Sequence, residues 1–383
     1  MKLRSKESGM GLVRYRLGDL IQVVDERNSN GIATVLGLNR EKQFMPTVAN
    51  TESIDLSKYK VVKKGRFAFS GMQTGRDKCI RIGIYDTDFE KAVISPAYTT
   101  FEVSKSEIID PTYLFMLFNS KERDRLGWFC SDSSIRSNLD WDRFCDFDLR
   151  LPPVEIQQKY VDIYNAMVAN QKCYEESLED LKLACDAELE ALMSEMEMDS
   201  IGGYIQLTDE RNNGIYSSDD VRGISIEKVF IPTKAKMDGV SVKNYKIVEP
   251  RDIAYVPVTS RNGGKITIAQ NVEGVAYLIS SAYTSFRCNE TKLLPEYLML
   301  FFTRPEFDRY ARFHSWGSAR EVFSWDDMRD VRIPIPDIKT QQSLANLFTA
   351  YNQRKEINEC MKTQIKDICP ILIKGSLEEA SKA

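Results

Sequence analysis

Apolar residues recur at alternating spacings of four and three along residues 154–198, a segment without proline or glycine. The stripe, with two polar interruptions, runs through Tyr160, Tyr164, Met167, Gln171, Tyr174, Leu178, Leu181, Cys185, Glu188 and Leu192. This spacing is typical of a coiled-coil seam. At 1.5 Å per residue, roughly 45 residues would form a helix of about 65 Å. Such a helix is too long to be a connector inside one compact domain.

A second apolar stripe of the same kind lies near the end of the chain. It consists of Leu344, Leu347, Tyr351, Met361, Ile365 and Ile368. We expect the helix that carries it to span residues 338–369 and to end before Pro370. A helix with one apolar stripe has to cover that stripe, and the other long stripe in the chain is its duplicate. We therefore expect the two helices to pair. Two-fold pairing of duplicated elements predicts an antiparallel arrangement.

Short runs rich in Val, Ile, Tyr and Phe, separated by turn residues, precede each long helix. They predict strands at residues 59–69 and 80–85, and again at residues 245–258 and 265–269. Each set is followed by an apolar segment that opens with proline, which predicts a buried helix against a sheet. These two segments are residues 111–119 and 295–303.

The two halves of the chain repeat one another. The turn DERNSNG at residues 25–31 returns as DERNNG at residues 209–214, and further matches follow at offsets of 184 to 186. They pair Tyr59–Val62 with Tyr245–Val248, Ala97-Tyr98-Thr99 with Ala282-Tyr283-Thr284, Tyr113-Leu114 with Tyr297-Leu298, and Trp141-Asp142 with Trp325-Asp326. Near the ends, the DLRLP of residues 148–152 is also paired with the DVRIP of residues 330–334, at an offset of 182. Solenoid periods are about 20 to 50 residues, so a repeat of this size indicates a duplicated domain.

The predicted fold is therefore of the α/β class, with two duplicated α/β domains separated by two long helices that form an antiparallel coiled coil. The predicted parts are a first domain (1–153), a central helix (154–200), a second domain (201–337) and a C-terminal helix with a tail (338–383). The alternative is that two independent helices each pack on a separate core.

Composition narrows the class of protein. The chain of 383 residues is 43% hydrophobic, without an 18-residue apolar run or a signal-peptide pattern at its start, which predicts a cytoplasmic protein without membrane partners. Eight cysteines form no C-x-x-C pair and one histidine is present, which disfavours a zinc site. Residues 1–153 hold 24 Lys/Arg against 21 Asp/Glu, a net charge of +3, whereas residues 154–200 hold 3 against 12, a net charge of −9.

Basic and amide side chains gather in the turns that follow equivalent strands. Arg, Lys, Asn and Gln are the side chains that read base edges, and glycine lets a backbone approach phosphate closely. The candidates for DNA contact are Gln73, Arg76, Lys78 and Arg81 in the first copy, and Arg261, Asn262 and Lys265 in the second. Arg136 and Arg320, in matched later loops, are further candidates. Ordinary solvated hairpin turns would show the same composition.

The sequence predicts no catalytic, cofactor-binding or metal-binding residues. It lacks a phosphate loop, since Gly264-Lys265 is followed by Ile266, and it lacks the G-x-G-x-x-G pattern. Pro152-Pro153 lacks the flanking residues of a methyltransferase N/D-P-P-Y/F motif. His314 next to Ser315 is no evidence for a triad. The acids Asp25/Glu26 and Asp209/Glu210 could bind a metal, but a turn or capping role suits them equally.

The end of each copy resembles the specificity (S) subunits of type I restriction-modification systems. In that family each target-recognition domain ends with a Gly-Ser turn, a short acidic helix, an I-P-x-P stretch and a Gln-rich helix start. Copy two reads GSAREVFSWDDMRDVRIPIPDIKTQQSLANLF at residues 317–348, and copy one reads SSIRSNLDWDRFCDFDLRLPPVEIQQKYV at residues 133–161, without the glycine.

The resemblance implies a non-catalytic reader of double-stranded DNA without a cofactor of its own. Each domain would read one half of a bipartite target, and the helix pair would set the gap. Methyltransferase (M) subunits, two in such systems, and restriction (R) subunits where present would be its partners. The alternatives are a specificity subunit of another methyltransferase-linked system, a duplicated-domain metal-dependent enzyme using Asp25 and Asp209, and a coiled-coil scaffold.

Overall fold

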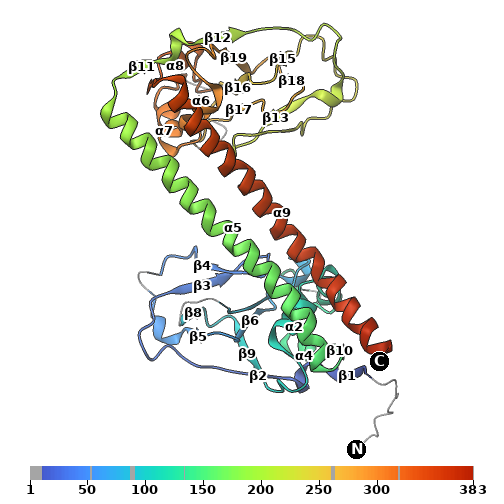
Figure 1. Cartoon of the computed structure of the whole chain (residues 1–383). Helices are drawn as coiled ribbons and strands as arrows, with labels where there is room; N and C mark the ends of the chain where they lie inside the picture. The colour runs from blue at the N-terminus through green and yellow to red at the C-terminus, as the bar shows by residue number, and fades with distance from the viewer. Residues whose placement is uncertain are drawn as a thin grey trace, which may run out of the picture. The chain divides into compact units, whose positions relative to one another are not determined.

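A computed structural model describes residues 11–51, 54–86, 91–132, 134–259, 264–317 and 320–382. The chain divides into two compact units (Figure 1). Unit 1 is Met1–Cys173 with Asn358–Ala383, and unit 2 is Tyr174–Ile357. The long helices α5 (Val154–Glu195) and α9 (Ile338–Lys382) each contribute one part to unit 1 and one part to unit 2. No helix in the described ranges carries an apolar stretch long enough to cross a membrane.

Unit 1 contains strands on two four-stranded sheets and one strand pair. The strand orders are β2-β9-β6-β7, β4-β3-β8-β5 and β1-β10. The strands are β1 (Val13–Arg16), β2 (Ile21–Val23), β3 (Val35–Leu38), β4 (Phe44–Pro46), β5 (Lys60–Val62), β6 (Phe67–Ser70), β7 (Arg81–Ile84), β8 (Ala92–Ile94), β9 (Thr99–Val103) and β10 (Asp148–Leu151). The helices ahead of α5 are α1 (Thr74–Asp77), α2 (Pro111–Phe118), α3 (Lys121–Phe129) and α4 (Trp141–Cys145).

Unit 2 repeats this plan. Its four-stranded sheet has the order β12-β19-β16-β17, which matches β2-β9-β6-β7 strand for strand, and its strand pairs are β13-β14, β15-β18 and β11-β20. The strands are β11 (Met198–Ser200), β12 (Ile205–Thr208), β13 (Arg222–Ile224), β14 (Phe230–Pro232), β15 (Lys246–Val248), β16 (Ile253–Tyr255), β17 (Ile268–Gln270), β18 (Tyr277–Ile279), β19 (Thr284–Cys288) and β20 (Arg332–Pro334). The helices are α6 (Pro295–Phe302), α7 (Pro305–Phe313) and α8 (Trp325–Arg329). The predicted duplication of an α/β domain is confirmed.

One sequence match is out of register by two residues. The strand partners Tyr15↔Leu149 and Asp199↔Ile333 show that Leu149 corresponds to Ile333, at an offset of 184. Matching DLRLP with DVRIP had paired Leu149 with Val331 instead. A strand has a side-chain period of two, so a slip of two residues preserves the apolar and polar alternation and escapes notice in the sequence.

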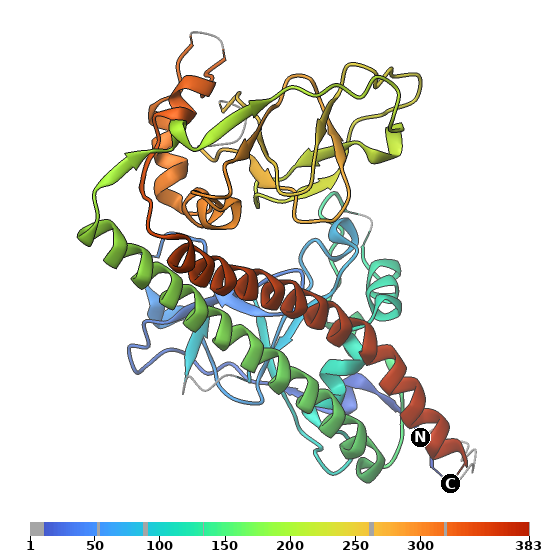
Figure 2. The ribbon, with the colours of Figure 1, turned by 45° about the horizontal axis from the view of Figure 1, so that its top comes forward.

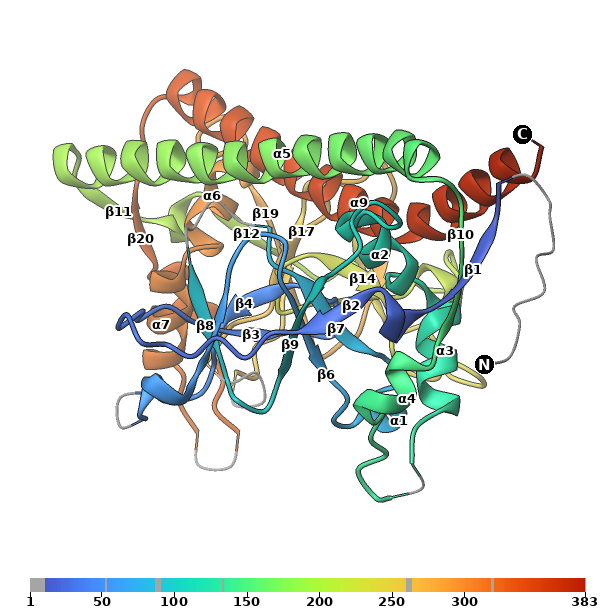
Figure 3. The same ribbon diagram turned by 90° about the horizontal axis from the view of Figure 1, so that it is seen from below.

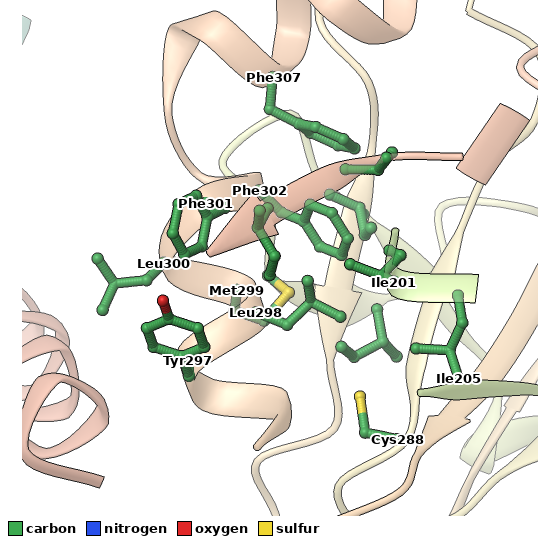
Figure 4. Packing of buried hydrophobic residues seen from close by; sticks show 14 of the residues in the cluster. Ile201, Ile205, Cys288, Tyr297, Leu298, Met299, Leu300, Phe301, Phe302 and Phe307 are labelled. Carbon is green, nitrogen blue, oxygen red and sulfur yellow. The ribbon is translucent and has the colours of Figure 1, made fainter. Parts of the chain in front are cut away.

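A short helix that is buried along almost its whole length forms the centre of each unit. In α2, every residue from Tyr113 to Phe118 is buried, between the β2-β9-β6-β7 sheet and the part of the α5/α9 pair that belongs to unit 1 (Figure 3). In α6, residues Tyr297 to Phe302 are buried in the same way, among Ile201, Ile205, Cys288 and other side chains (Figure 4). Each fully buried Leu or Phe stabilises a unit by about 1.5–3 kcal/mol.

Glutamine ties each short helix to the start of the long helix. Gln157 is fully buried, donates to the carbonyls of Ile108 and Pro152, and accepts from the N–H of Asp110, which caps α2. In unit 2, Gln341 makes the equivalent bonds to Lys292, Pro336 and Leu294. An apolar residue could not satisfy these buried backbone groups. The repeated Gln-Gln sequence is therefore a structural feature.

Within unit 1 the two long helices run antiparallel (Figure 1 and Figure 2). Lys159 Nζ donates to Glu379 over 2.7 Å, and Gln171 Nε2 donates to Asn358 Oδ1 over 2.9 Å, so residue numbers rise along α5 as they fall along α9. The predicted polar interruption at Gln171 is thus paired across the helices. The supercoil that the seam predicts stays a prediction.

The predicted seam is wrong at one position. Glu188 is exposed and Leu189 is fully buried, so the buried and half-buried positions run 181, 185, 189 and 192. Two successive spacings of four rotate the stripe relative to a strict heptad. The carboxylate therefore lies in solvent and a leucine takes its place in the unit 2 core.

The expectation that Pro370 marks the end of the second helix is also wrong. Helix α9 continues through Pro370 to Lys382. Proline removes one backbone hydrogen bond and usually breaks a helix. Here the residues after it, including Leu372 and Ser376, are buried against unit 1, and Ser376 Oγ lies 2.6 Å from Tyr113 Oη. This packing keeps the helix intact beyond the proline.

The repeated DERN turn is a structural element in both units. Asn28 is buried and exchanges hydrogen bonds with the backbone of Ile32, and Asn212 does the same with Tyr216. Arg27 donates to Asp25 and to the carbonyl of Lys58, and Arg211 repeats both contacts. Asp25 and Asp209 are thus engaged in ion pairs within the turn, which is the turn role that the sequence left open.

Candidate nucleic-acid interface

Two loops of unit 1 that carry candidate DNA contacts lie against one another beside α1, α3 and α4 (Figure 3). The backbone N–H of Gln73 donates to Asn138 Oδ1 over 3.0 Å. The N–H of Gly75 donates to the carbonyl of Ser137 over 2.9 Å, and the N–H of Leu139 donates to that of Gly71 over 2.8 Å. The structure therefore brings the first group of candidates next to the loop of Arg136.

Glycine is required at both contact points. A Cβ atom on Gly71 would lie 1.8 Å from the carbonyl oxygen of Leu139, and a Cβ atom on Gly75 would lie 1.9 Å from Ser137 Oγ. Both distances are shorter than any real contact, so a larger residue would push the loops apart. The glycines that suggested phosphate approach in the sequence serve this loop contact.

The candidate side chains Gln73, Arg76, Lys78 and Arg136 of unit 1 are exposed or half-buried, and the first three make local contacts. Gln73 has a left-handed backbone (φ 61°), and its Oε1 accepts from Arg76 Nη2 over 2.8 Å. Lys78 is also left-handed (φ 52°), and its ammonium lies 4.6 Å from the centroid of Trp128. The side chain of Arg136 is exposed. These side chains can reach an incoming ligand without first giving up a buried contact.

Arg81 occupies a different setting from the other candidates. It lies in β7 with its side chain 26% exposed, and its Nη2 donates to Asp77 Oδ2 over 2.5 Å. Its position directly after α1 made it look equivalent to Arg76 in the sequence. In the structure its first role is to hold Asp77.

Unit 2 has the equivalent pair of loops. The N–H of Thr259 donates to the carbonyl of Glu321 over 3.0 Å, and the N–H of Phe323 donates to that of Pro257 over 2.8 Å. The exposed side chains of Lys265 and Arg320 belong to these loops. Arg261 and Asn262 lie outside the described residues. Gly317 has φ 139°, and a Cβ atom there would lie 2.2 Å from the carbonyl oxygen of Arg320, so the Gly-Ser turn of copy two requires its glycine.

Sequence comparison missed a buried ion pair that supports these loops in both units. Lys42 Nζ lies 2.8 Å from Asp124 Oδ1, and Lys228 Nζ lies 2.8 Å from Asp308 Oδ1. Both lysines have left-handed backbones, with φ 64° and 61°. Lys42 also donates to the carbonyl of Phe118, the last residue of α2, and Lys228 to that of Phe302, the last residue of α6. The signal was present as Glu-Lys-x-Phe at residues 41–44 and 227–230, at an offset of 186.

Each of these aspartates also holds the strand that follows the loop. Asp124 Oδ1 accepts from the N–H of Ile80 over 2.9 Å, and Asp308 Oδ1 accepts from that of Ile266 over 3.2 Å. Burial lowers the pKa of Lys228, against the opposing effect of Asp308. An unpaired ammonium there would be costly, so the ion pair fixes the end of the loop.

The single histidine and its neighbouring serine have structural surroundings. His314 packs against Tyr310 with the two rings tilted by 35° and their centroids 4.2 Å apart. The Ser315 hydroxyl is buried, donates to the carbonyl of Ala311 over 2.6 Å, and lies 2.9 Å from Thr259 Oγ1. Ser315 thus joins the two loops of unit 2.

Comparisons with known proteins point to one family. No family model matches the chain. A curated relative, the type I restriction enzyme HindI specificity subunit of Haemophilus influenzae, is 23% identical over 132 residues, which are 34% of this chain and 28% of that protein. The chain thus matches little more than a quarter of that relative's length.

Similarity to solved structures extends over nearly the whole chain. The type I restriction-modification S subunit from M. genitalium superposes with a TM-score of 0.60 at 11% identity, covering 98% of each chain. A structure described in terms of complex assembly and conformational transition of the type I system superposes with a TM-score of only 0.43, at 15% identity over 100% of this chain and 99% of the other. From the first of these superpositions, the chain has the fold of the specificity subunits of type I restriction-modification systems.

Proposed function

We propose that the chain is the DNA-specificity subunit of a type I restriction-modification complex. In this proposal it carries out no catalysis. The α/β domain of each unit reads one half of a bipartite target in double-stranded DNA, and the long helices α5 and α9 set the gap. Two methyltransferase subunits bound to it supply the chemistry, together with restriction subunits where these exist.

The observation that carries the proposal is that the two units share the hydrogen bonds that join their two loops but differ in the residues that these loops carry. Both units join their two loops by hydrogen bonds at equivalent positions, Gly75 to Ser137 and Thr259 to Glu321. The candidate residues of the first loop nevertheless differ in sequence, with Gln73, Arg76 and Lys78 in copy one and Arg261, Asn262 and Lys265 in copy two. Reading two different half-sites requires both features. Contacts to the DNA phosphates position each domain in the same way, and contacts from side chains to base edges select the sequence.

The experiment that tests the proposal is methylation with and without a partner. The chain is purified alone and together with the methyltransferase encoded beside it, and each preparation is incubated with S-adenosylmethionine and genomic DNA. We expect the pair to copurify and to methylate one bipartite motif that the methyltransferase alone leaves unmodified. Methylation by the isolated chain, or a methyltransferase that neither binds it nor changes its motif, would contradict the proposal.

Arg76 is expected to read a base in one half-site. Its side chain is 61% exposed and its guanidinium is oriented by Gln73. Replacing Arg76 by alanine should cost about 1–3 kcal/mol at one half-site, which is roughly 5- to 150-fold in affinity. Methylation of a library in which each target position is varied would show relaxed choice at one or two positions.

The control for this variant is Arg320→Ala in unit 2, in the loop that matches the loop of Arg136. It should relax choice in the other half-site and leave the first unchanged. If both variants relax the same half-site, or if both weaken all sequences equally, these arginines do not read bases in separate halves.

A further inference from the structure

Charged side chains gather around α1 in a way that the sequence did not reveal. Asp77 Oδ2 accepts from Arg81 Nη2 over 2.5 Å, and Asp77 Oδ1 accepts from Arg40 Nη2 over 2.9 Å. Arg76 Nε lies 3.5 Å from the same Oδ1. Arg40 comes from the turn between β3 and β4, 37 residues earlier in the chain. One carboxylate therefore brings together three guanidinium groups from separate segments.

The charge of this cluster is not balanced. Three arginines around one aspartate leave a net charge of about +2, since arginine stays protonated at neutral pH. The Asp77 side chain is only 2% exposed, whereas those of Arg40 and Arg76 are 64% and 61% exposed. The carboxylate is thus inside and the positive charge faces solvent.

Neighbouring acids already have other partners. Asp124 pairs with Lys42, Glu41 pairs with Lys366 of α9, and Asp132 accepts from Ser134 and Asn138. Burial alone would raise the pKa of the Asp77 carboxyl, but the hydrogen bond from Arg81 and the charges of the arginines hold this pKa below its ordinary value. Asp77 therefore stays ionised and keeps the cluster assembled over the working pH range.

The guanidinium groups keep free donors for a ligand. Each carries five N–H donors in a planar fork that suits carboxylate and phosphate oxygens. Arg40 and Arg81 each direct one donor to Asp77. The Nε of Arg81 is buried and has no acceptor among the residues that the structure describes. Two arginines held a fixed distance apart by one carboxylate are arranged for an oxyanion in advance of binding.

This cluster belongs to copy one. The residue that corresponds to Arg40 in the repeat is Ile226, two positions before Lys228 as Arg40 is two before Lys42. The ion pair that supports the loops is present in both copies, as Lys42–Asp124 and Lys228–Asp308. A contact to a DNA phosphate does not depend on the DNA sequence, so one copy can have it without the other.

We propose that Arg40 and Arg81, held by Asp77, form a binding site for one DNA backbone phosphate beside the base-reading Arg76. This inference rests on the proposed function and adds Arg40, which neither the repeat nor the basic turns indicated. Arg40 and Arg81 contact the phosphate, and Asp77 is a positioning residue. The phosphate contact places unit 1 on the duplex, and Arg76 then meets the base edge.

The test is the salt dependence of binding by the full chain in its methyltransferase complex. Dissociation constants are measured for a duplex that contains the motif methylated by the complex and for a duplex of scrambled sequence. The salt concentration is varied from about 50 mM to about 200 mM. Each phosphate contact contributes about 0.9 to the slope of log K against log salt. Arg40→Ala should reduce the slope by about that amount on both duplexes, so its deficit in affinity should be about 3.5-fold larger at the low salt end than at the high end.

Two further variants complete the experiment. Arg40→Lys should restore most of the slope, because a point charge suffices for a phosphate. Lys64→Ala is the control, since Lys64 is 78% exposed and lies at the opposite end of β6 from α1, so its removal should leave the slope unchanged. Arg40 is exposed, and unchanged thermal unfolding of Arg40→Ala would show that the fold is intact.

The outcomes separate the inference from the proposed function. If wild-type complex prefers its target but Arg40→Ala keeps the wild-type slope, the phosphate site is wrong and the function stands. If Arg40→Ala loses affinity for the target alone, with an unchanged slope, the cluster reads bases and the phosphate site is also wrong. If wild-type complex shows no preference for any target, the proposed function itself fails.

Discussion

Replacing Arg66 by aspartate is expected to destabilise unit 1 by about 3–5 kcal/mol. The Arg66 side chain is 2% exposed, its Nε donates to Glu102 Oε1 over 2.8 Å, and its Nη1 donates to the carbonyl of Val61 and lies 2.9 Å from Glu26. The variant would place a buried carboxylate beside the partly exposed carboxylates of Glu26 and Glu102, and it would leave the Val61 carbonyl without its donor. Breaking a buried ion pair in this way is among the costliest single substitutions.

The second copy supplies the matched rescue. At the equivalent positions it carries the same ion pair with reversed polarity, since Arg287 Nε donates to Asp252 Oδ1 over 2.7 Å and Arg287 Nη2 to Asp252 Oδ2 over 2.9 Å. The hydrogen bond to Asp252 raises the pKa of Arg287, and the charge of Glu210, which corresponds to Glu26, adds to this effect, so the third charge is present there too. The double variant Arg66→Asp/Glu102→Arg should therefore recover most of the lost stability.

Unfolding in urea, followed by tryptophan fluorescence, would measure both effects. In a background with Trp316 and Trp325 replaced by phenylalanine, the remaining tryptophans, Trp128 and Trp141, report on unit 1 alone. Each midpoint gives a free energy of unfolding for that unit. A single variant as stable as its parent, or a double variant no more stable than the single one, would show that the two copies do not share this interaction.

The reversed ion pair explains why the sequence revealed the duplication but not all of its content. Identity matching finds residues that keep their type, such as Asn28 and Asn212, whose buried amides leave no alternative. It scores Arg66 against Asp252 as a mismatch, although both occupy the start of an equivalent strand. Complementarity between partners is preserved there while each residue changes, and only a spatial pairing reveals it.

The limits of the predicted helices and strands have similar physical causes. The first residues of α2 and α6 could be predicted because each helix begins with a proline. The end of α9 could not be read from Pro370, because the buried residues beyond it, not local propensity, hold the helix together. Glu188 was placed in the seam because a strict heptad was assumed, whereas tertiary packing selects Leu189.

The candidate interface was predictable in part for the same reason. Basic turns after equivalent strands pointed to Arg76 and Lys78, and the structure places the loop of Arg136 beside them. Arg40 could not be found this way. Its contact with Asp77 joins two turns that are far apart in the sequence, and copy two has no counterpart to mark it.

The seam irregularity in α5 bears on how the proposed spacer would respond to insertions. Successive spacings of four at residues 181, 185 and 189 are what a four-residue insertion adds to a heptad pattern. The helix already accommodates one such step. Additional sets of four residues should therefore be tolerated where α5 and α9 pair, provided that both helices are lengthened together.

Lengthening both helices by four residues is expected to widen the gap in the DNA target by one base pair. The insertions go between Cys173 and Tyr174 and between Ile357 and Asn358, so the Gln171–Asn358 and Ser177–Arg354 hydrogen bonds are both kept. Four residues add about 6 Å and rotate the downstream part of the helix by about 40°. One base pair adds about 3.4 Å and rotates the next half-site by about 35°. For a spacer that runs along the DNA, the helix rotation of about 40° matches the rotation of about 35° per base pair, so we expect the gap to widen by one base pair.

A seven-residue insertion at the same two points is the discriminating control. It preserves the heptad better and adds about 10 Å, which is the rise of about three base pairs, but it rotates the downstream part of the helix by about −20°. Three base pairs turn the duplex by about 105°, so the second domain would face away from its half-site. Methylome sequencing should show a longer gap with unchanged half-sites for the four-residue variant and loss of methylation for the seven-residue variant. Methylation of the original spacing by either variant would show that these helices do not set the gap.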